Sequence, residues 1–263
     1  MTPPTTRLRF AEPADAAVLA AFLGRHLRWD RTAAVRLRAE GGVLAVFARP
    51  ARFEVVAVLP LPLAATGTPA EPLDLTVSAG ELLEGIEGLD NPDGSDGTGV
   101  PDEPPGSSGA DAGPPAGVRL PAPVTGPPWT GLLPPREGWQ RVAEPPAESV
   151  RAAAGAVIGE FRDRTERLGP DERTRAALEA LAEEIWSRPL PDTPLPLRAV
   201  HAAHALGFLA APGTPAAENP VVLTAGSWVR LRTPRGSVAV RRSGAPSLPF
   251  VAPASAGRGH HGH

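Results

Sequence analysis

The sequence predicts an α+β protein with two ordered parts joined by a linker. Three observations lead to this expectation. Apolar residues alternate along several short segments, they recur every three to four residues along longer ones, and a proline- and glycine-rich stretch separates the two groups. We expect an α+β domain at 5–87, a disordered acidic linker at 88–128, a helical domain with a C-terminal β-hairpin at 129–242, and a disordered tail at 243–263.

The first part is predicted to be one helix on a meander of three or four strands. The helix over 13–28 begins with proline, which suits a first helical position. Gly41 and Gly42 separate two alternating runs and indicate a two-residue hairpin turn. Ser78, followed three residues later by glutamate, forms a capping box for a short helix over 79–87. Strands are predicted at 7–10, 33–40, 43–48, 53–59 and 73–77.

The linker differs sharply in composition from the segments around it. Residues 88–128 hold 10 Pro and 9 Gly in 41 positions. Such a segment cannot bury enough apolar surface to offset the entropy lost on ordering. The run 90–97 has a superficial likeness to a calcium-binding loop, but it lacks the alternating ligand positions and the distal glutamate. A solvated linker is therefore expected.

The second part is predicted to contain three helices and then a hairpin. Helices are expected over 147–168, 171–188 and 195–209, and the third should be the most buried because it is apolar on nearly every side. The strip at 129–139 holds two Trp and two Leu without a regular period. We expect this strip to dock on the surface of a domain, and a partner-binding extended peptide is the alternative.

The C-terminal hairpin supplies the candidate binding face. Strands over 228–232 and 237–241 flank a turn at 233–236, whose proline and glycine suit a type I turn. A lone hairpin is marginally stable, so its apolar face must pack on the helices. Side-chain alternation places on that apolar face Val229, Leu231, Val238 and Val240. The opposite face carries the possible binding residues Trp228, Arg230, Arg232 and Arg241, with Arg235 at the tip.

Composition excludes several kinds of chemistry. The chain has no Cys, and all 26 basic residues are Arg. Disulfides, thiolate metal sites, Schiff-base lysines and phosphate-loop lysines are therefore impossible. The net charge is −3, but residues 219–263 carry 6 Arg and no acid, which makes the C-terminal end basic.

Two histidines are the weak metal candidates. His201 and His204 lie three residues apart on the third helix, and a zinc site would need further carboxylate or histidine ligands. Satisfied or partly exposed core histidines are the simpler interpretation. No nucleophile elbow, phosphate-binding loop or dinucleotide fingerprint is present, so we expect no cofactor and no catalysis. A hydrolase or metal enzyme with scattered residues is the second alternative.

The order helix, helix, hairpin is that of a winged-helix unit. The third helix offers chiefly Arg198 and two histidines, so a nucleic acid would be held by its phosphate backbone rather than read by base. Two other possibilities stay open. The hairpin arginines could pair with carboxylates of the preceding helices or of the acidic linker in the same chain, or they could bind an acidic protein partner. The sequence therefore predicts an interaction or regulatory module, with a nucleic-acid binder as the first alternative.

The strip at 129–139, the run Ile185-Trp-Ser-Arg-Pro189 and the hairpin together resemble a family of uncharacterised proteins from high-GC actinobacteria. The resemblance covers most of the chain outside the linker and implies no activity. No apolar run approaches the ~20 residues of a membrane span, and the N-terminus lacks the apolar core of a signal peptide. A cytoplasmic protein without a membrane partner is expected.

Overall fold

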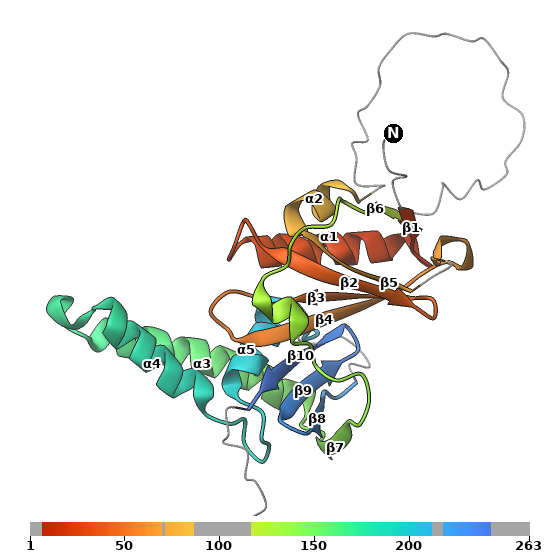
Figure 1. The fold of residues 1–263 in the computed structure, drawn as a ribbon. Helices are drawn as coiled ribbons and strands as arrows, with labels where there is room; N and C mark the ends of the chain where they lie inside the picture. Colours follow the sequence, from red (N-terminus) through yellow and green to blue (C-terminus); the bar gives the residue numbers. More distant parts are fainter. Residues whose placement is uncertain (1–6, 70–71, 87–116, 212–217, 243–263) are drawn as a thin grey trace, which may run out of the picture.

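The computed structural model describes residues 7–69, 72–86, 117–211 and 218–242 (Figure 1). The predicted tail and residues 88–116 of the predicted linker lie outside these ranges. The described chain forms an eight-stranded antiparallel sheet, with helices on one face, and a separate two-stranded sheet. No helix within these ranges is long and apolar enough to cross a membrane.

The N-terminal elements agree with the sequence pattern. The capping serine is confirmed, because the Ser78 hydroxyl accepts a hydrogen bond from the amide of Glu81. The third long strand continues beyond its predicted end at residue 59, through Pro60 and Pro62. This is possible because β10 pairs only as far as Val58, so the prolines have one neighbouring strand. The elements are β1 (Arg7–Arg9), α1 (Pro13–Leu27), β2 (Ala34–Glu40), β3 (Val43–Ala48), β4 (Val55–Pro62), η1 (Ala65–Gly67), β5 (Leu73–Ser78) and α2 (Ala79–Glu84).

The C-terminal elements include strands that the sequence pattern does not predict. Residues 117–128, expected within the disordered linker, begin with a strand that pairs with β1, so the linker prediction is too long. β7 and β8 are short and were also missed. The elements are β6 (Gly117–Arg119), η2 (Pro128–Gly131), β7 (Gln140–Ala143), α3 (Ala147–Arg167), η3 (Pro170–Glu172), α4 (Arg175–Ser187), α5 (Leu197–Ala205), β8 (Val221–Ala225), β9 (Trp228–Thr233) and β10 (Gly236–Arg241).

The strand order shows two similar halves joined at the centre. The order is β5-β2-β3-β4-β10-β9-β8-β7, so two three-strand meanders meet through their last strands. β4 and β10 pair from Val55 opposite Val240 to Val58 opposite Ser237. The winged-helix prediction is therefore wrong. The wing of such a unit has a free edge, whereas β10 is paired on both sides within one continuous sheet.

One apolar core lies between this sheet and α1, α2, α3 and α5. α5 crosses the junction of the halves and contacts β4, β9 and β10. Its buried face consists mainly of alanine, so its backbone can approach the sheet closely. As predicted, the apolar side of the hairpin faces this core, and its members are at most 5% exposed: Val229, Leu231, Val238 and Val240.

Phe208, just after α5, anchors the core beneath the hairpin turn. Its ring stacks on Phe22 of α1 with the centroids 5.8 Å apart. Gly236 lies directly against the same ring with a φ of +150°, and a Cβ atom at this position would be only 2.7 Å from the ring. Glycine is therefore required where β10 begins.

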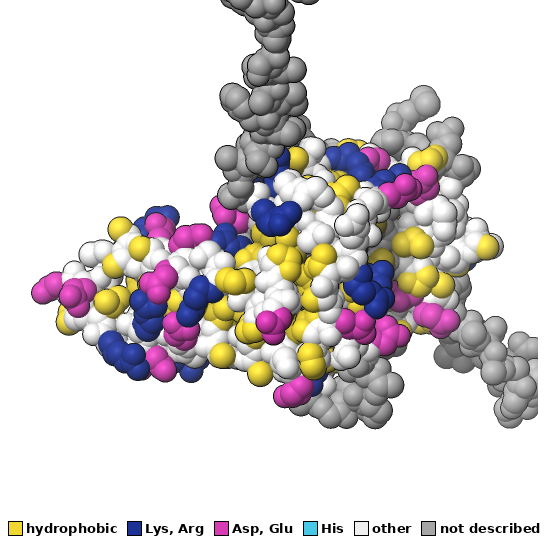
Figure 2. Space-filling model, turned by 90° about the horizontal axis from the view of Figure 1, so that it is seen from below, with side chains coloured by type: hydrophobic (Ala, Val, Ile, Leu, Met, Phe, Trp, Pro, Cys, Tyr) yellow, Lys and Arg dark blue, Asp and Glu magenta, His cyan; other side chains and the backbone are white. Residues whose placement is uncertain are grey.

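α3 and α4 project from the sheet as a two-helix arm (Figure 1). Val157, Leu181 and Ile185 form a separate apolar cluster at the base of this arm, and Phe161 packs against them while partly exposed. The arm therefore places these residues outside the hairpin core. Basic and acidic side chains are interleaved along the arm (Figure 2).

Five aromatic rings connect the two halves in a continuous row. The centroids of Trp29 and Phe53 are 5.4 Å apart, and those of Phe53 and His201 are 5.0 Å apart. The row continues to Trp186 at 5.3 Å and to Phe161 at 4.8 Å. It therefore links the loop after α1 and the β3–β4 loop with α5, α4 and α3.

The two clusters predict different costs for two phenylalanine truncations. Phe208→Ala should lower the free energy of unfolding by about 3–5 kcal/mol, because it removes a fully buried ring from the main core. Phe161→Ala should cost roughly 1–2 kcal/mol, because part of that ring already lies in water. Chemical denaturation of both variants provides the test. Equal losses would contradict the assignment of the two residues to separate clusters.

Candidate anion-binding surface

The predicted binding residues lie on the sheet face opposite the helices. The register places Trp228 beside Arg241, Arg230 beside Ala239, and Arg232 beside Ser237. Trp228 is only 9% exposed, because it packs with an apolar cluster on this outer face that includes Val56, Val58 and Ala239. The indole is therefore not available to stack on a base.

A strap, residues 120–139, crosses this outer face (Figure 1, yellow-green to green). The amide of Val124 donates to the carbonyl of Thr76 on β5 at 2.8 Å, and the Arg36 guanidinium donates to the carbonyl of Thr130. Leu133 and Trp139 pack against the outer apolar cluster. The prediction that the strip at 129–139 docks on its own protein is confirmed.

The strap covers the middle of the predicted arginine face. The Arg230 guanidinium lies over the Trp139 ring, 5.4 Å from its centroid, and the Trp139 indole donates to the carbonyl of Pro135 at 2.8 Å. Burial, and secondarily the charge of Arg232, lowers the pKa of Arg230 from its ordinary value. Arg230 therefore fixes the strap to the sheet and is a poor candidate for contact with a partner.

The remaining hairpin arginines are exposed. Within the described ranges, no carboxylate forms an ion pair with Arg232, Arg235 or Arg241. The expectation that they pair with helix carboxylates of the same chain is thus not met in the described structure, and the carboxylates of the predicted acidic linker lie outside the described residues. The arginines that do form ion pairs there are Arg36, Arg38, Arg136, Arg141, Arg151, Arg164, Arg175, Arg188 and Arg198.

These three arginines lie at two ends of the hairpin. Arg232 and Arg235 are next to the turn, whereas Arg241 is opposite Trp228 at the far end of β9. Four residues along a strand span about 13 Å. The exposed hairpin charges are therefore divided into two positions, with the Arg230–Trp139 contact between them.

The two candidate metal ligands do not converge on a common site. The His201 ring lies between Phe53 and Trp186, while His204 is exposed. Burial, and then the nearby His204, lowers the pKa of His201 to about 4. In the part of the chain that the structure describes, no group of three or more His, Cys, Asp or Glu side chains could hold a metal ion.

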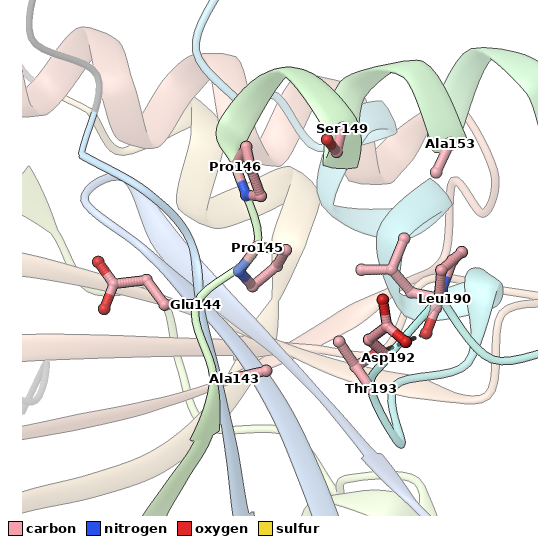
Figure 3. Close-up of a pocket in the computed structure, with 10 residues that line it drawn as sticks. Ala143, Glu144, Pro145, Pro146, Ser149, Ala153, Leu190, Asp192 and Thr193 are labelled. Carbon is pink, nitrogen blue, oxygen red and sulfur yellow. Dashed lines mark hydrogen bonds between the residues drawn. The ribbon is translucent and has the colours of Figure 1, made fainter.

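A hollow of about 360 Å³ lies between the start of α3 and the loop from α4 to α5 (Figure 3). Its walls are mainly apolar, and Ser149 and Thr193 contribute hydroxyl groups. Of its two carboxylates, Glu144 points away from the other lining residues and pairs with Arg141 at 2.7 Å. Asp192 has the uncommon positive φ of 59°. These groups do not form the pair of convergent acid and base side chains that hydrolysis requires.

Two families match the chain. Residues 3–105 match the family described as "Domain of unknown function (DUF8010)", and residues 134–245 match "Domain of unknown function (DUF8185)". Each match covers less than half of the chain. The DUF8010 match covers the α1 half and the DUF8185 match covers the β8–β10 half, so the β4–β10 junction brings the two matched segments into one sheet. Neither family brings an activity with it.

Solved structures give a distant likeness. The H. pylori β clamp in complex with 5-chloroisatin has 9% identity, with 94% of this chain and 66% of that chain covered, at a TM-score of 0.44. Pol III β of Caulobacter crescentus has 14% identity, with 89% and 64% covered, at 0.41. The DNA polymerase sliding clamp from Pseudomonas aeruginosa has 13% identity, with 91% and 67% covered, at 0.40. This chain thus spans about two thirds of the length of those chains. Because the TM-scores are low, the likeness supports no functional conclusion. No curated protein sequence matches it significantly.

Buried histidines predict how stability depends on pH. His26 is 1% exposed, and burial lowers its pKa to about 4, as burial does for His201. Between the unfolded value near 6.5 and about 4, the unfolded chain binds more protons, so the free energy of unfolding should fall as the pH falls through this interval. Urea denaturation at about pH 7.5 and about pH 5 measures this loss.

His26→Leu should reduce the loss, because leucine cannot bind a proton in either state. His201→Leu should reduce the loss as well, because burial also lowers the pKa of that ring. A wild-type stability that is equal at the two pH values would contradict the burial of His26 and His201 as neutral rings.

Proposed function

We propose that the protein is a non-catalytic interaction module that holds an anionic partner on the exposed arginines of its C-terminal hairpin. The observation that supports this most directly is the exposure of Arg232, Arg235 and Arg241. They are exposed, and in the described structure they lack the carboxylate partners that many other arginines of the chain have. An exposed guanidinium without a partner can donate two parallel hydrogen bonds to a carboxylate or a phosphate.

Rigidity of the underlying sheet supports the same proposal. Arg232 lies on β9, which pairs with β8, and Arg241 ends β10, which pairs with β4 as far as Val240. In the turn, the amide of Arg235 donates to the Thr233 hydroxyl at 3.3 Å. Their positions are therefore set before a partner arrives, which lowers the entropy lost on binding. Two kinds of partner fit this chemistry: the carboxylates of an acidic protein, and the phosphate backbone of a nucleic acid as the alternative.

The test replaces Arg232, Arg235 and Arg241 together with serine and measures retention on immobilised heparin, a general polyanion. The variant should elute at lower salt than the wild type, because it lacks the unpaired charges that face the column. Thermal melting should change little, because the side chains are exposed and unpaired in the described structure.

The control variant makes the same change in net charge elsewhere. Arg164, Arg175 and Arg188 are bound to carboxylates on the arm, and their replacement by serine should leave heparin retention closer to that of the wild type. Equal shifts in the two variants would show that only net charge matters. That result, or heparin retention of the hairpin variant equal to that of the wild type, would reject the hairpin as the binding surface.

A further inference from the structure

Two loops of the N-terminal half carry further arginines without ion-pair partners. The loop between α1 and β2 holds Arg28 and Arg31, and the loop between β3 and β4 holds Arg49 and Arg52. All four side chains are exposed. None of them forms an ion pair with a carboxylate in the ranges the structure describes, unlike Arg36 and Arg38, the next arginines after the first loop, both of which bind Asp74.

The fold brings these loops together at one end of the sheet. β2 begins, β3 ends and β4 begins at this end, as their antiparallel registers require. The edge-to-face contact of Trp29 with Phe53 holds one loop beside the other. β10 ends here too, because Val240 is opposite Val55, and this places Arg241 and Arg242 next to the β3–β4 loop. We name these six residues the arginine end: Arg28, Arg31, Arg49, Arg52, Arg241 and Arg242.

The acidic residues of the two loops are already engaged. Asp30 accepts hydrogen bonds from the amide and the hydroxyl of Thr32, and these bonds lower its pKa. Glu54 forms an ion pair with Arg198 of α5 at 3.0 Å. Asp30 keeps its negative charge and Glu54 is paired with Arg198, so the four loop arginines still leave an excess of positive charge, which Arg241 and Arg242 increase.

The backbone of the β3–β4 loop is unusual for its sequence. Arg52 and Glu54 have φ values of +74° and +53°, which non-glycine residues rarely adopt. Such conformations persist only where the surrounding structure imposes them, and they are concentrated at functional sites. Here the Phe53 ring, held by Trp29 and His201, fixes the loop between these two residues.

We propose that the arginine end binds the phosphate backbone of a nucleic acid. This proposal extends the proposed function, with which it shares Arg241. Interfaces with acidic proteins usually contain apolar or aromatic anchors at their centre, whereas backbone contacts to nucleic acids are polar and strongly basic. The large apolar side chains that are most exposed in the described structure lie outside these two loops and the end of β10: Val18, Val43, Val124, Leu132 and Val142. The aromatic side chains of the two loops, Trp29 and Phe53, are half-buried and pack against each other.

The chemistry of the six side chains agrees with this partner. A guanidinium presents a planar set of donors that matches two phosphate oxygens. One of these donors is engaged at Arg242, whose Nη2 donates to the carbonyl of Gly226 at 2.9 Å. The arginines come from loops and a strand end, without a helix that could enter the major groove. Binding should therefore depend weakly on base sequence and strongly on salt.

The experiment measures fluorescence anisotropy of a short duplex DNA, at about 50 mM salt and upward, with the full chain. The loop variant replaces Arg28, Arg31, Arg49 and Arg52 with serine, and the matched control replaces Arg162, Arg164, Arg167 and Arg175 on the arm. The loop variant should bind at least about tenfold more weakly, and its log–log salt slope should shrink by about 0.9 for each phosphate that it no longer neutralises. The arm control should stay near the wild type.

Three results would overturn the proposal: no binding of duplex by the wild type at about 50 mM salt, equal weakening of the loop variant and the arm control, or an unchanged loop variant. Thermal melting checks that each variant is folded, and the double variant Arg28→Ser with Arg49→Ser replaces the fourfold one if that one does not fold.

The same measurement separates the two proposals. A variant with Arg232 and Arg235 replaced by serine, which leaves the arginine end intact, is measured beside the loop variant on DNA and on heparin. If only the loop variant loses DNA binding, the arginine end is supported and the hairpin turn is not. If the Arg232 and Arg235 variant loses heparin retention while the loop variant binds DNA as tightly as the wild type, the proposed function survives and this inference fails.

Discussion

The antiparallel pairing of β4 with β10 is the constraint on which the rest of the structure depends. It joins two three-strand meanders into one sheet, with Val55–Val58 opposite Ser237–Val240. The helices of both halves then share one core, and α5 lies across the junction. The same pairing places the end of β10 beside the β3–β4 loop, which collects arginines from distant parts of the sequence at one end of the sheet. The junction thus adds Arg241 and Arg242 to the arginines of the two N-terminal loops.

The two sheet faces have different roles. The helix-covered face holds the main core, including the valines of the hairpin, whereas the outer face is partly covered by the strap. Arg230 and Trp139 hold the strap at the middle of this face, and Arg36 binds it at the other half. The arginines of this chain, which has no lysine, therefore fall into two groups. Some guanidiniums fix the protein to itself through carboxylates, carbonyls or an aromatic ring, and others are exposed without an ion pair in the described structure.

Local patterns in the sequence predicted most of the long elements, because periodicity and turn residues report on a segment's own conformation. The valine face of the hairpin was correct for this reason. The pairing of β10 with β4 was missed, since a pairing between residues 55–58 and 237–240 leaves no trace in either segment alone. The burial of Trp228 and Arg230 was missed because the strap that covers them has no regular period. The loop arginines were each visible in the sequence, but their gathering at one end follows from strand register, which sequence alone did not supply.

The most direct test of this account is amide hydrogen exchange along β10. If β10 is a central strand, the amides of residues 237–240 should exchange as slowly as those of β3, through global unfolding only. If the hairpin were instead a wing that opens on its own, these amides would exchange about a thousandfold faster than those of β3, which corresponds to about 4 kcal/mol of local stability. Slow exchange in both β3 and β10 is the result expected here. Fast exchange confined to β9 and β10 would contradict the β4–β10 junction and the arrangement of arginines that depends on it.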